Sequence, residues 1–351
     1  KAIDNTIVEI KSNKKGSVVI SGIQDENYQN LILLINEKLS SNSFNPSKTI
    51  LTRDGKDEDV LQLISDMNQG KVGALIMCGV NPAYTLSNSE EFIKSLKSLE
   101  MSICFSMKND ETANHSKYVA ASNHYLESWC DYELVSNEYS LAQPVIKTLF
   151  DTKQFQEILL VWNENKTTVH DYIKNYWNNN ILGTNSWNKA LHDGVFVKRR
   201  KNKILSKSKS KSNKNIFKLE DVNSSNKFEL NIYPKTGMGD GQHANNPWLQ
   251  EFPDPLTRAT WDNYLTISEH DAKEIGLYLE PSTFFNQSRN DANGGLNGKY
   301  AIVKLGNKEL KVPALIQPGQ ARGTVGLAFG YGRSQGVKSE MMTGVNAYQL
   351  Y

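Results

Sequence analysis

ALIMCGVNP, residues 74–82, is an apolar run that ends in a Gly-Val-Asn-Pro turn. Such a run, without polar alternation, is typical of a strand that is buried on both faces. An amphipathic segment over 57–67 precedes it, and another over 92–99 follows it. MSICFSM (101–107) then predicts a further buried strand. Strands of this kind alternating with helices predict an α/β domain with a parallel sheet covered by helices.

The same alternation extends towards the N-terminus. SVVISG (17–22) predicts a short strand, and residues 27–39 place apolar side chains at helical spacing. We therefore assign residues 1–150 to the α/β domain. Residues 151–196 predict a helical extension that contains tryptophans and ends in SWNKALHDGV (186–195).

The last third of the chain changes to a period of two. Four segments alternate polar and apolar residues or form short apolar runs between turns: KFELNIY (227–233), YAIVKLG (300–306), ELKVPALI (309–316) and TVGLAFG (324–330). This pattern predicts a small, mostly-β domain over 227–351, closed into a double-psi-like barrel.

Two local signals refine this β domain. Ser268 is a predicted N-cap of one short helix, and Gly276 is predicted to end it. Glycines recur from 319 to 336, which favours tight turns or close approach of the backbone to a neighbour.

A basic, low-complexity segment separates the two halves, and we assign it to a linker over 197–226. From Lys198 to Lys218 there are ten Lys or Arg and no acidic residue, so the net charge of +2 becomes −8 without them. A solvated linker is expected, with a docking strip for an anionic membrane surface or an acidic subunit as the alternative. Nucleic acid is disfavoured, because no aromatic residue is interleaved from Lys198 to Lys214.

The sequence offers no pattern of metal or cluster ligands. Cys78, Cys104 and Cys130 are 26 residues apart and form no CxxC or CxxCH pair, the spacings that clusters and attached haem use. Cys78 and Cys104 lie in apolar runs, where a thiol is expected to pack as a small hydrophobe. The six histidines are scattered, and no HExxH or GxSxG occurs. No catalytic residue and no metal ligand is therefore predicted.

The candidate ligand-binding residues lie in two loops. Gly79, Asn81 and Pro82 follow the predicted strand at 74–78, at the sheet edge where α/β proteins bind ligands. His243 lies in GMGDGQHANNPW (237–248), which is suited to hydrogen-bonding a polar heterocycle or to packing against a partner protein.

The segment NPWLQEFPDPLTRATWDNYLTISEHDAKEIGL (246–277) resembles the molybdopterin-dinucleotide-binding barrel of the large molybdopterin oxidoreductases. The sequence motifs PWLQEFPDP, TWDN and GVNAY (344–348) are more similar to one branch of this family. That branch is the fused iron–sulfur and molybdopterin-like subunit of alternative complex III, a respiratory quinol-oxidising assembly. GVNP, DETA (110–113) and HYLESW (124–129) occur in the order seen in the family's preceding α/β domain.

The resemblance implies a scaffold without its own redox centre. The family's molybdenum ligand lies in a domain upstream of these two. Where catalytic members carry Leu-Pro and an E-x-x-G-T run, this chain has AAS (120–122) and ESWCDYE (127–133). We thus expect no cofactor in this chain, and iron–sulfur clusters and haem on other parts or subunits of the complex.

The resemblance also implies partners and a location. The expected partners are a ferredoxin-like iron–sulfur part, a multihaem cytochrome and quinol-binding membrane subunits. The expected location is the periplasmic side of the inner membrane, with only indirect membrane contact. Because the chain starts at Lys1 without Met or an export segment, we expect a processed chain or a piece of a longer polypeptide.

Two other function classes stay open. The chain could be the C-terminal half of an active molybdopterin oxidoreductase, with Gly79, Asn81, Pro82, His243 and Asn263 contacting a molybdopterin guanine dinucleotide. It could also be a free-standing nucleotide-binding module without a redox partner.

Overall fold

The computed structural model describes residues 1–351 except 24, 47, 53–54, 199–226 and 278–294. The chain forms two compact units, each assembled from three separate stretches. Unit 1 comprises 1–55, 128–145 and 167–223, and unit 2 comprises 56–127, 146–166 and 224–351. The domain limits expected from the sequence stay a prediction. The predicted linker lies, from residue 199 onward, outside the described residues.

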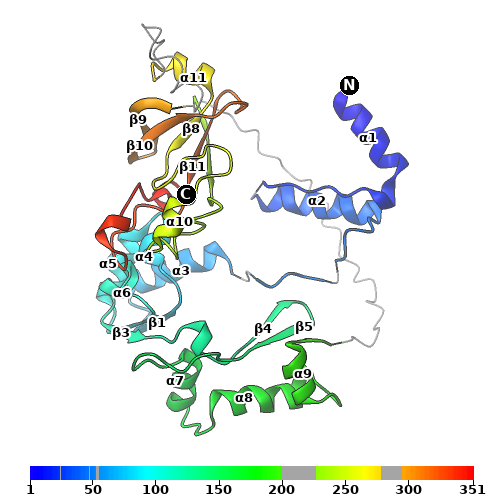
Figure 1. Cartoon of the computed structure of the whole chain (residues 1–351), viewed down its shortest axis with the longest axis vertical. Helices are drawn as coiled ribbons and strands as arrows, with labels where there is room; N and C mark the ends of the chain where they lie inside the picture. Colours follow the sequence, from blue (N-terminus) through cyan, green and yellow to red (C-terminus); the bar gives the residue numbers. More distant parts are fainter. Residues whose placement is uncertain (24, 47, 53–54, 199–226, 278–294) are drawn as a thin grey trace. The chain divides into compact units, whose positions relative to one another are not determined.

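Unit 2 contains the predicted parallel sheet. β1 (Ala74–Cys78), β2 (Met101–Ser106) and β3 (Tyr118–Ala121) lie in the order β1-β2-β3. Both strand pairs are parallel, with Ile76 opposite Ile103 and Ile103 opposite Tyr118. Since consecutive parallel strands need crossover connections, helices join them, as Figure 1 shows. The α/β prediction is confirmed for this part of the chain.

Helices α3 (Asp57–Asn68) and α5 (Ser89–Ser98) cover one face of that sheet. Their apolar stripes form a core with the inward residues of the strands: Ile64, Met67, Met77, Phe92, Leu96, Leu99, Cys104 and Ala113. On the other face, α7 (Phe155–Trp162) places two rings against Phe105. These contacts position the ends of β1 and β2.

Burial of β1 on both faces is not observed. Ile76 is 44% exposed and the Cys78 thiol is exposed, whereas Cys104 on the central strand β2 is fully buried. The expectation that both thiols pack in a core is therefore confirmed for Cys104 and wrong for Cys78. Ile76 and Cys78 lie on the face of β1 opposite Met77, which is buried against α3 and α5, and the α7 rings contact Phe105 of the neighbouring strand β2.

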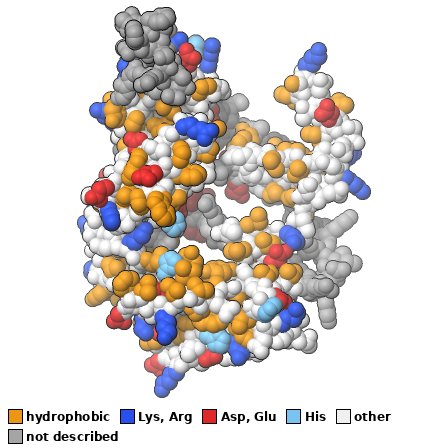
Figure 2. All heavy atoms as spheres, in the orientation of Figure 1, with side chains coloured by type: hydrophobic (Ala, Val, Ile, Leu, Met, Phe, Trp, Pro, Cys, Tyr) orange, Lys and Arg blue, Asp and Glu red, His pale blue; other side chains and the backbone are white. Residues whose placement is uncertain are grey.

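The prediction of a strand at 17–22 is also wrong. In unit 1 these residues pair with no described strand, and Ile20 is 86% exposed. The Asn36 side chain of α2 (Glu26–Leu39) instead accepts from the Val19 amide (2.8 Å) and donates to the Val19 carbonyl (2.7 Å). A side-chain amide thus satisfies backbone groups that a sheet would have paired. Figure 2 shows hydrophobic side chains exposed along α1 (Ala2–Ser12) and α2.

The rest of unit 1 is a small sheet with helices. β4 (Cys130–Val135), β5 (Glu138–Ala142) and β6 (Val195–Val197) pair antiparallel. The described helical segments of unit 1 after β5 are α8 (Val169–Tyr176), the π-helical turn η3 (Trp177–Ile181) and α9 (Trp187–Asp193). Trp177 and Trp187 are buried in their core.

The β region of unit 2 is one mixed sheet in the order β7-β11-β8-β10-β9. Its strands are β7 (Glu229–Tyr233), β8 (Leu265–Ile267), β9 (Gly295–Leu305), β10 (Lys308–Ile316) and β11 (Thr324–Ala328). Pairs β7–β11 and β8–β10 are parallel, and β8–β11 and β9–β10 are antiparallel. The mostly-β prediction is confirmed, whereas closure into a double-psi-like barrel stays a prediction.

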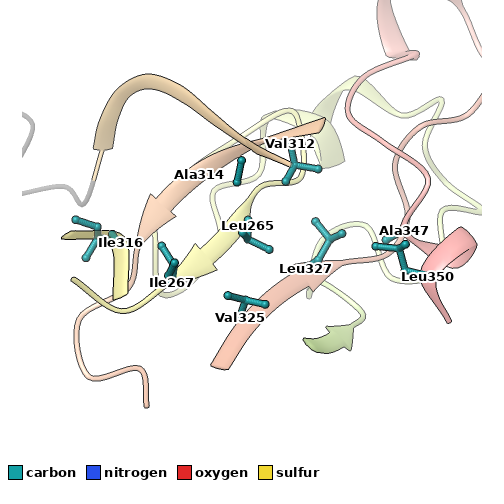
Figure 3. Close-up of a cluster of buried hydrophobic side chains, with 11 residues drawn as sticks. Leu265, Ile267, Val312, Ala314, Ile316, Val325, Leu327, Ala347 and Leu350 are labelled. Atoms are coloured by element: carbon teal, nitrogen blue, oxygen red, sulfur yellow. The ribbon is translucent and has the colours of Figure 1, made fainter. Parts of the chain in front are cut away.

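One face of this sheet carries the core of the β region. Leu265, Ile267, Val312, Val325 and Leu327 point towards one another from three strands (Figure 3). The predicted helix is α11 (Glu269–Glu274), where the Ser268 hydroxyl accepts from the Asp271 amide and Gly276 lies beyond the end at φ +74°. Val312 of this core comes from the period-two segment at 309–316, and Val325 and Leu327 come from the segment at 324–330.

Candidate functional site

The two loops at the carboxyl ends of β1 and β2 meet at one edge of the parallel sheet. After β1, Gly79 has φ +64°, and its amide donates to the Phe105 carbonyl (3.0 Å). Asn81 then precedes α4 (Pro82–Thr85), with Pro82 at the first helical position. After β2, the Asp110 side chain caps α6 (Glu111–His115) by accepting from the Ala113 amide (2.9 Å). This geometry brings Asn81 next to the first turn of α6.

Asn81 is bonded at both ends of its side-chain amide. Its Oδ1 accepts from the Thr112 amide (3.1 Å) and the Thr112 hydroxyl (2.7 Å), and its Nδ2 donates to Glu111 Oε2 (2.7 Å). The Thr112 hydroxyl also accepts from the Ala83 amide (3.0 Å). Since an asparagine amide offers two donors and two acceptor positions, three of its four are used inside the protein.

Glu111 forms a buried ion pair with Arg333 of the loop that follows β11. The side chains are 7% and 4% exposed, and Arg333 Nη2 lies 2.8 Å from Glu111 Oε2. Arg333 Nε lies 3.0 and 3.2 Å from the two carboxylate oxygens. The amides of Ser334 (2.8 Å) and Gln335 (3.1 Å) donate to Oε1. The carboxylate is thus enclosed by charged and neutral donors.

The electrostatics of this pair follow from these contacts. Burial by itself raises the pKa of the Glu111 carboxyl, but hydrogen bonds from Arg333, Asn81 and Ser334 outweigh it and lower that pKa to about 2. Burial also opposes the charge of Arg333, and the bonds to Glu111 raise its pKa above the ordinary value. Both groups are therefore charged at neutral pH, and each is the partner that makes burial of the other tolerable.

Tyr84 packs against Arg333 in the same site. The guanidinium carbon of Arg333 lies 4.7 Å from the centre of the Tyr84 ring, within cation–π distance. Arg333 Nη1 donates to the Gly241 carbonyl (2.8 Å), and the Tyr84 hydroxyl donates to the Tyr331 carbonyl (2.7 Å). We call Asn81, Tyr84, Glu111, Thr112 and Arg333 the edge network.

Glycines permit this closeness, as the sequence predicted for the 319–336 stretch. A Cβ on Gly332 would lie 2.1 Å from the Asn346 amide nitrogen, and one on Gly336 would lie 3.0 Å from the Asp110 Cα. Both glycines have positive φ. Close backbone approach is thus confirmed at these two positions.

The residues proposed from sequence for a dinucleotide fall into three situations. Gly79 and Pro82 form the turn at the sheet edge, and Asn81 belongs to the edge network. His243 is exposed in its loop, with its carbonyl accepting from the Asn246 amide. Asn263 is fully buried: its Nδ2 donates to the carbonyls of Ala328 and Val345, and its Oδ1 accepts from the Val345 amide. Binding of a dinucleotide by the five stays a prediction.

Sequence analysis missed Tyr84, Glu111, Thr112 and Arg333 as members of the site. Glu111 lies in the DETA motif, which carried a resemblance and no assigned role. Arg333 was recognisable as a single arginine between Gly332 and Gly336, in a stretch without acidic residues. A lone charge in a glycine-rich loop favours a distant partner, but the identity of that partner depends on the fold.

One group in the described residues has metal-compatible geometry. His270, Asp271 and Glu274 offer ligand atoms within 4.8 Å of one another. However, Asp271 Oδ2 accepts from the Ser268 hydroxyl (2.7 Å) and the Gly323 amide (2.9 Å), and Glu274 pairs with Lys227 (3.1 Å). Asp271 thus takes part in the N-terminal cap of α11, and Glu274 takes part in a surface ion pair.

No family model and no curated protein matches the chain. Among solved structures it is similar to acetylene hydratase from Pelobacter acetylenicus, with 14% identity and a TM-score of 0.47, over 76% of this chain and 39% of that one. The chain therefore spans well under half of that protein's length. In the part of the chain that the structure describes, no helix has the length and apolarity needed to cross a membrane. A likeness at this TM-score carries no conclusion about family or activity.

Proposed function

We propose that this chain is a non-catalytic scaffold within the molybdopterin-like subunit of a respiratory quinol-oxidising complex of the alternative complex III type. In this role the chain holds no redox centre. Iron–sulfur clusters and haem belong to other parts or subunits, and this chain lies peripherally on the periplasmic side of the inner membrane as part of the membrane complex. The partners are a ferredoxin-like part, a multihaem cytochrome and quinol-binding membrane subunits.

The edge network is the observation that supports a scaffold. A ligand at the carboxyl edge of a parallel sheet needs free donors and acceptors there. Here Asn81 is bonded to Thr112 and Glu111, and Glu111 accepts from Arg333 and from two backbone amides. Diverting these groups to a cofactor would leave a buried charge without its partner, at a cost of about 3–5 kcal/mol. The same polar groups that could hold a ligand therefore hold the two parts of unit 2 together.

The choice of complex rests on the sequence motifs. PWLQEFPDP, TWDN and GVNAY resemble the molybdopterin-like subunit of alternative complex III, and the departures at 120–122 and 127–133 replace motifs of catalytic members. The lack of clustered Cys and His in the sequence agrees with redox centres held elsewhere.

Purification of the native protein from membranes tests the proposal. An affinity tag on the intact gene product, followed by mild detergent extraction, is expected to bring down a haem-staining cytochrome and polytopic subunits. The purified assembly is expected to oxidise quinol and to show iron–sulfur signals by electron paramagnetic resonance.

A variant of the edge network, Asn81→Ala, tests whether this region is structural or catalytic. Asn81→Ala is expected to lower the thermal stability of the assembly and to leave quinol oxidation per assembled complex unchanged. Migration of the native protein alone, without haem, would overturn the proposal. So would a selective loss of turnover in Asn81→Ala assemblies of full composition.

A further inference from the structure

A second polar region lies on the outer face of the five-stranded sheet. Residues of β7 alternate there: Leu230 and Ile232 pack on the apolar core, whereas Glu229, Asn231 and Tyr233 line a cavity of about 440 Å³. Thr266 of β8 lines the same cavity, between core residues Leu265 and Ile267. The volume is in the range of small-ligand sites, about 300–1,000 Å³. We call this the outer-face cavity.

A glycine forms part of the cavity wall. A Cβ on Gly326 would lie 2.5 Å from the Thr266 hydroxyl and 3.2 Å from a Tyr233 ring carbon. Only a residue without a side chain fits at this point of β11, between Thr266 and Tyr233. The wall is therefore built of backbone and of the surrounding polar side chains.

The chemistry of the lining is acidic and rich in acceptors. Glu229 and Asp254 contribute two carboxylates, and no Lys or Arg is among the described lining residues. Asp254 Oδ1 accepts from the amides of Leu256 and Thr257 (both 2.9 Å), which fixes the carboxylate and leaves Oδ2 as an acceptor. The Gln320 Nε2 donates to the carbonyls of Thr266 (3.1 Å) and Thr324 (2.7 Å), which leaves its Oε1 as an acceptor.

The nearby Lys235 does not neutralise this lining by an ion pair with a described residue. Its Nζ lies 3.2 Å from the Tyr331 hydroxyl and 3.4 Å from the Asp262 carbonyl, and the side chain is buried. Asp254 acts on it only at longer range, by raising its pKa against the larger effect of burial. The cavity thus complements a cation with several N–H donors.

We propose that the outer-face cavity binds the side chain of an arginine presented by a partner polypeptide. A guanidinium carries five donors in a plane, which matches two carboxylates and an amide oxygen better than the compact ammonium of lysine does. The lining favours a polypeptide over a free small cation, because Leu256 lines the cavity and is 77% exposed. Apolar contacts around a central arginine are typical of protein interfaces. This inference does not depend on which complex the chain belongs to.

Two isosteric peptides test the site on the full chain. Acetyl-Gly-Arg-Gly-amide is expected to bind at least about tenfold tighter than the same peptide with citrulline, which keeps the shape and removes the charge. Binding is measured by calorimetry at low salt and is expected to weaken as salt rises. Equal affinities for the two peptides, or no binding of either, would overturn the proposal.

Variants locate the site. Glu229→Gln combined with Asp254→Asn is expected to weaken the arginine peptide about tenfold, and Glu309→Gln, which removes a surface carboxylate paired with Lys304, is expected to have no effect. An equal loss in both variants would place the peptide elsewhere on the surface and overturn the assignment. Free agmatine binding as tightly as the peptide would show a small-molecule site and overturn the assignment to a partner.

Carboxylate footprinting extends the test to the native assembly. Carbodiimide labelling of Glu229 and Asp254 is expected to fall severalfold between the isolated chain and the assembly. Unchanged labelling at both residues would contradict a partner arginine there. This readout is separate from quinol oxidation and haem content, so its failure would leave the proposed scaffold role standing.

Discussion

The edge network and the outer-face cavity are two regions of unit 2 that contain carboxylates, and they differ in whether a carboxylate is paired with a cation. In the edge network, Glu111 is buried and accepts from a buried guanidinium and from backbone amides. In the outer-face cavity, Glu229 is exposed and forms no ion pair with a described residue. In the edge network the charged groups of both sides are present and paired within the chain. In the outer-face cavity only the acidic side is present, and the cationic partner is expected from another polypeptide. The difference teaches that binding capacity lies where polar groups are unpaired, and not wherever a fold usually places its ligand.

The largest expected effect breaks the edge network. Arg333→Met keeps much of the side-chain volume and leaves Glu111 buried without its cation, so it is expected to lower the free energy of unfolding of unit 2 by about 3–5 kcal/mol. The midpoint of urea denaturation measures this loss of unfolding free energy, and amide hydrogen exchange in β11 assigns it to unit 2. Arg322→Met, at an exposed arginine, is the control and is expected to change stability by less than about 0.5 kcal/mol. Similar losses in both variants would contradict the role given to the pair.

Acid is expected to weaken the edge network. The pKa of Glu111 is lowered from 4.5 to about 2, so its contribution is fully present above about pH 4.5 and is lost as pH falls towards 2. The contribution at neutral pH is about 3 kcal/mol. Unfolding free energies measured from pH 6 to 2 should therefore converge for the native chain and Glu111→Gln. Curves that stay parallel would show that Glu111 has an ordinary pKa.

Two asparagines sharpen the comparison. Asn81→Ala removes three hydrogen bonds to partly buried groups and is expected to cost about 2 kcal/mol. Asn231→Ala, at an exposed cavity residue, is expected to be within about 0.5 kcal/mol of the native chain. Matching urea midpoints for the two variants would remove the distinction between a closed and an open region.

The smallest expected effect concerns the cavity wall. Gly326→Ala brings a methyl group against Thr266 and Tyr233 and is expected to cost about 1 kcal/mol while weakening the arginine peptide. Gly73→Ala, where a Cβ meets open space, is the control and should be neutral or slightly stabilising. Thermal unfolding and calorimetry measure the two effects. An unchanged peptide affinity in Gly326→Ala would place binding away from this wall.

Local patterns predicted the elements of unit 2 well. Apolar runs at 74–78 and 101–106 became parallel strands, and the alternation at 309–316 became β10, because each pattern depends on near neighbours. The capped helix after Ser268 was also predicted, since the cap and Gly276 act within a few residues. What failed was the strand at 17–22, because Asn36 satisfies the Val19 backbone and no described strand pairs with it.

The edge network could not be predicted from the sequence alone. Glu111 and Arg333 are 222 residues apart, and neither local spacing nor composition connects them. The sequence identified the correct loop through Asn81, but it could not show that the amide was already used. A residue's chemistry is visible in the sequence, whereas the saturation of its hydrogen bonds depends on the fold.

The most direct test of the central claim is the molybdenum and pterin content of the native assembly. Metal is quantified by mass spectrometry of the purified complex, and pterin by fluorescence of its oxidised extract, each per copy of this chain. If Asn81, Glu111 and Arg333 close the sheet edge as described, neither molybdenum nor tungsten nor pterin will approach one per chain. Stoichiometric metal with a released guanine dinucleotide would contradict the account and establish the active-enzyme alternative.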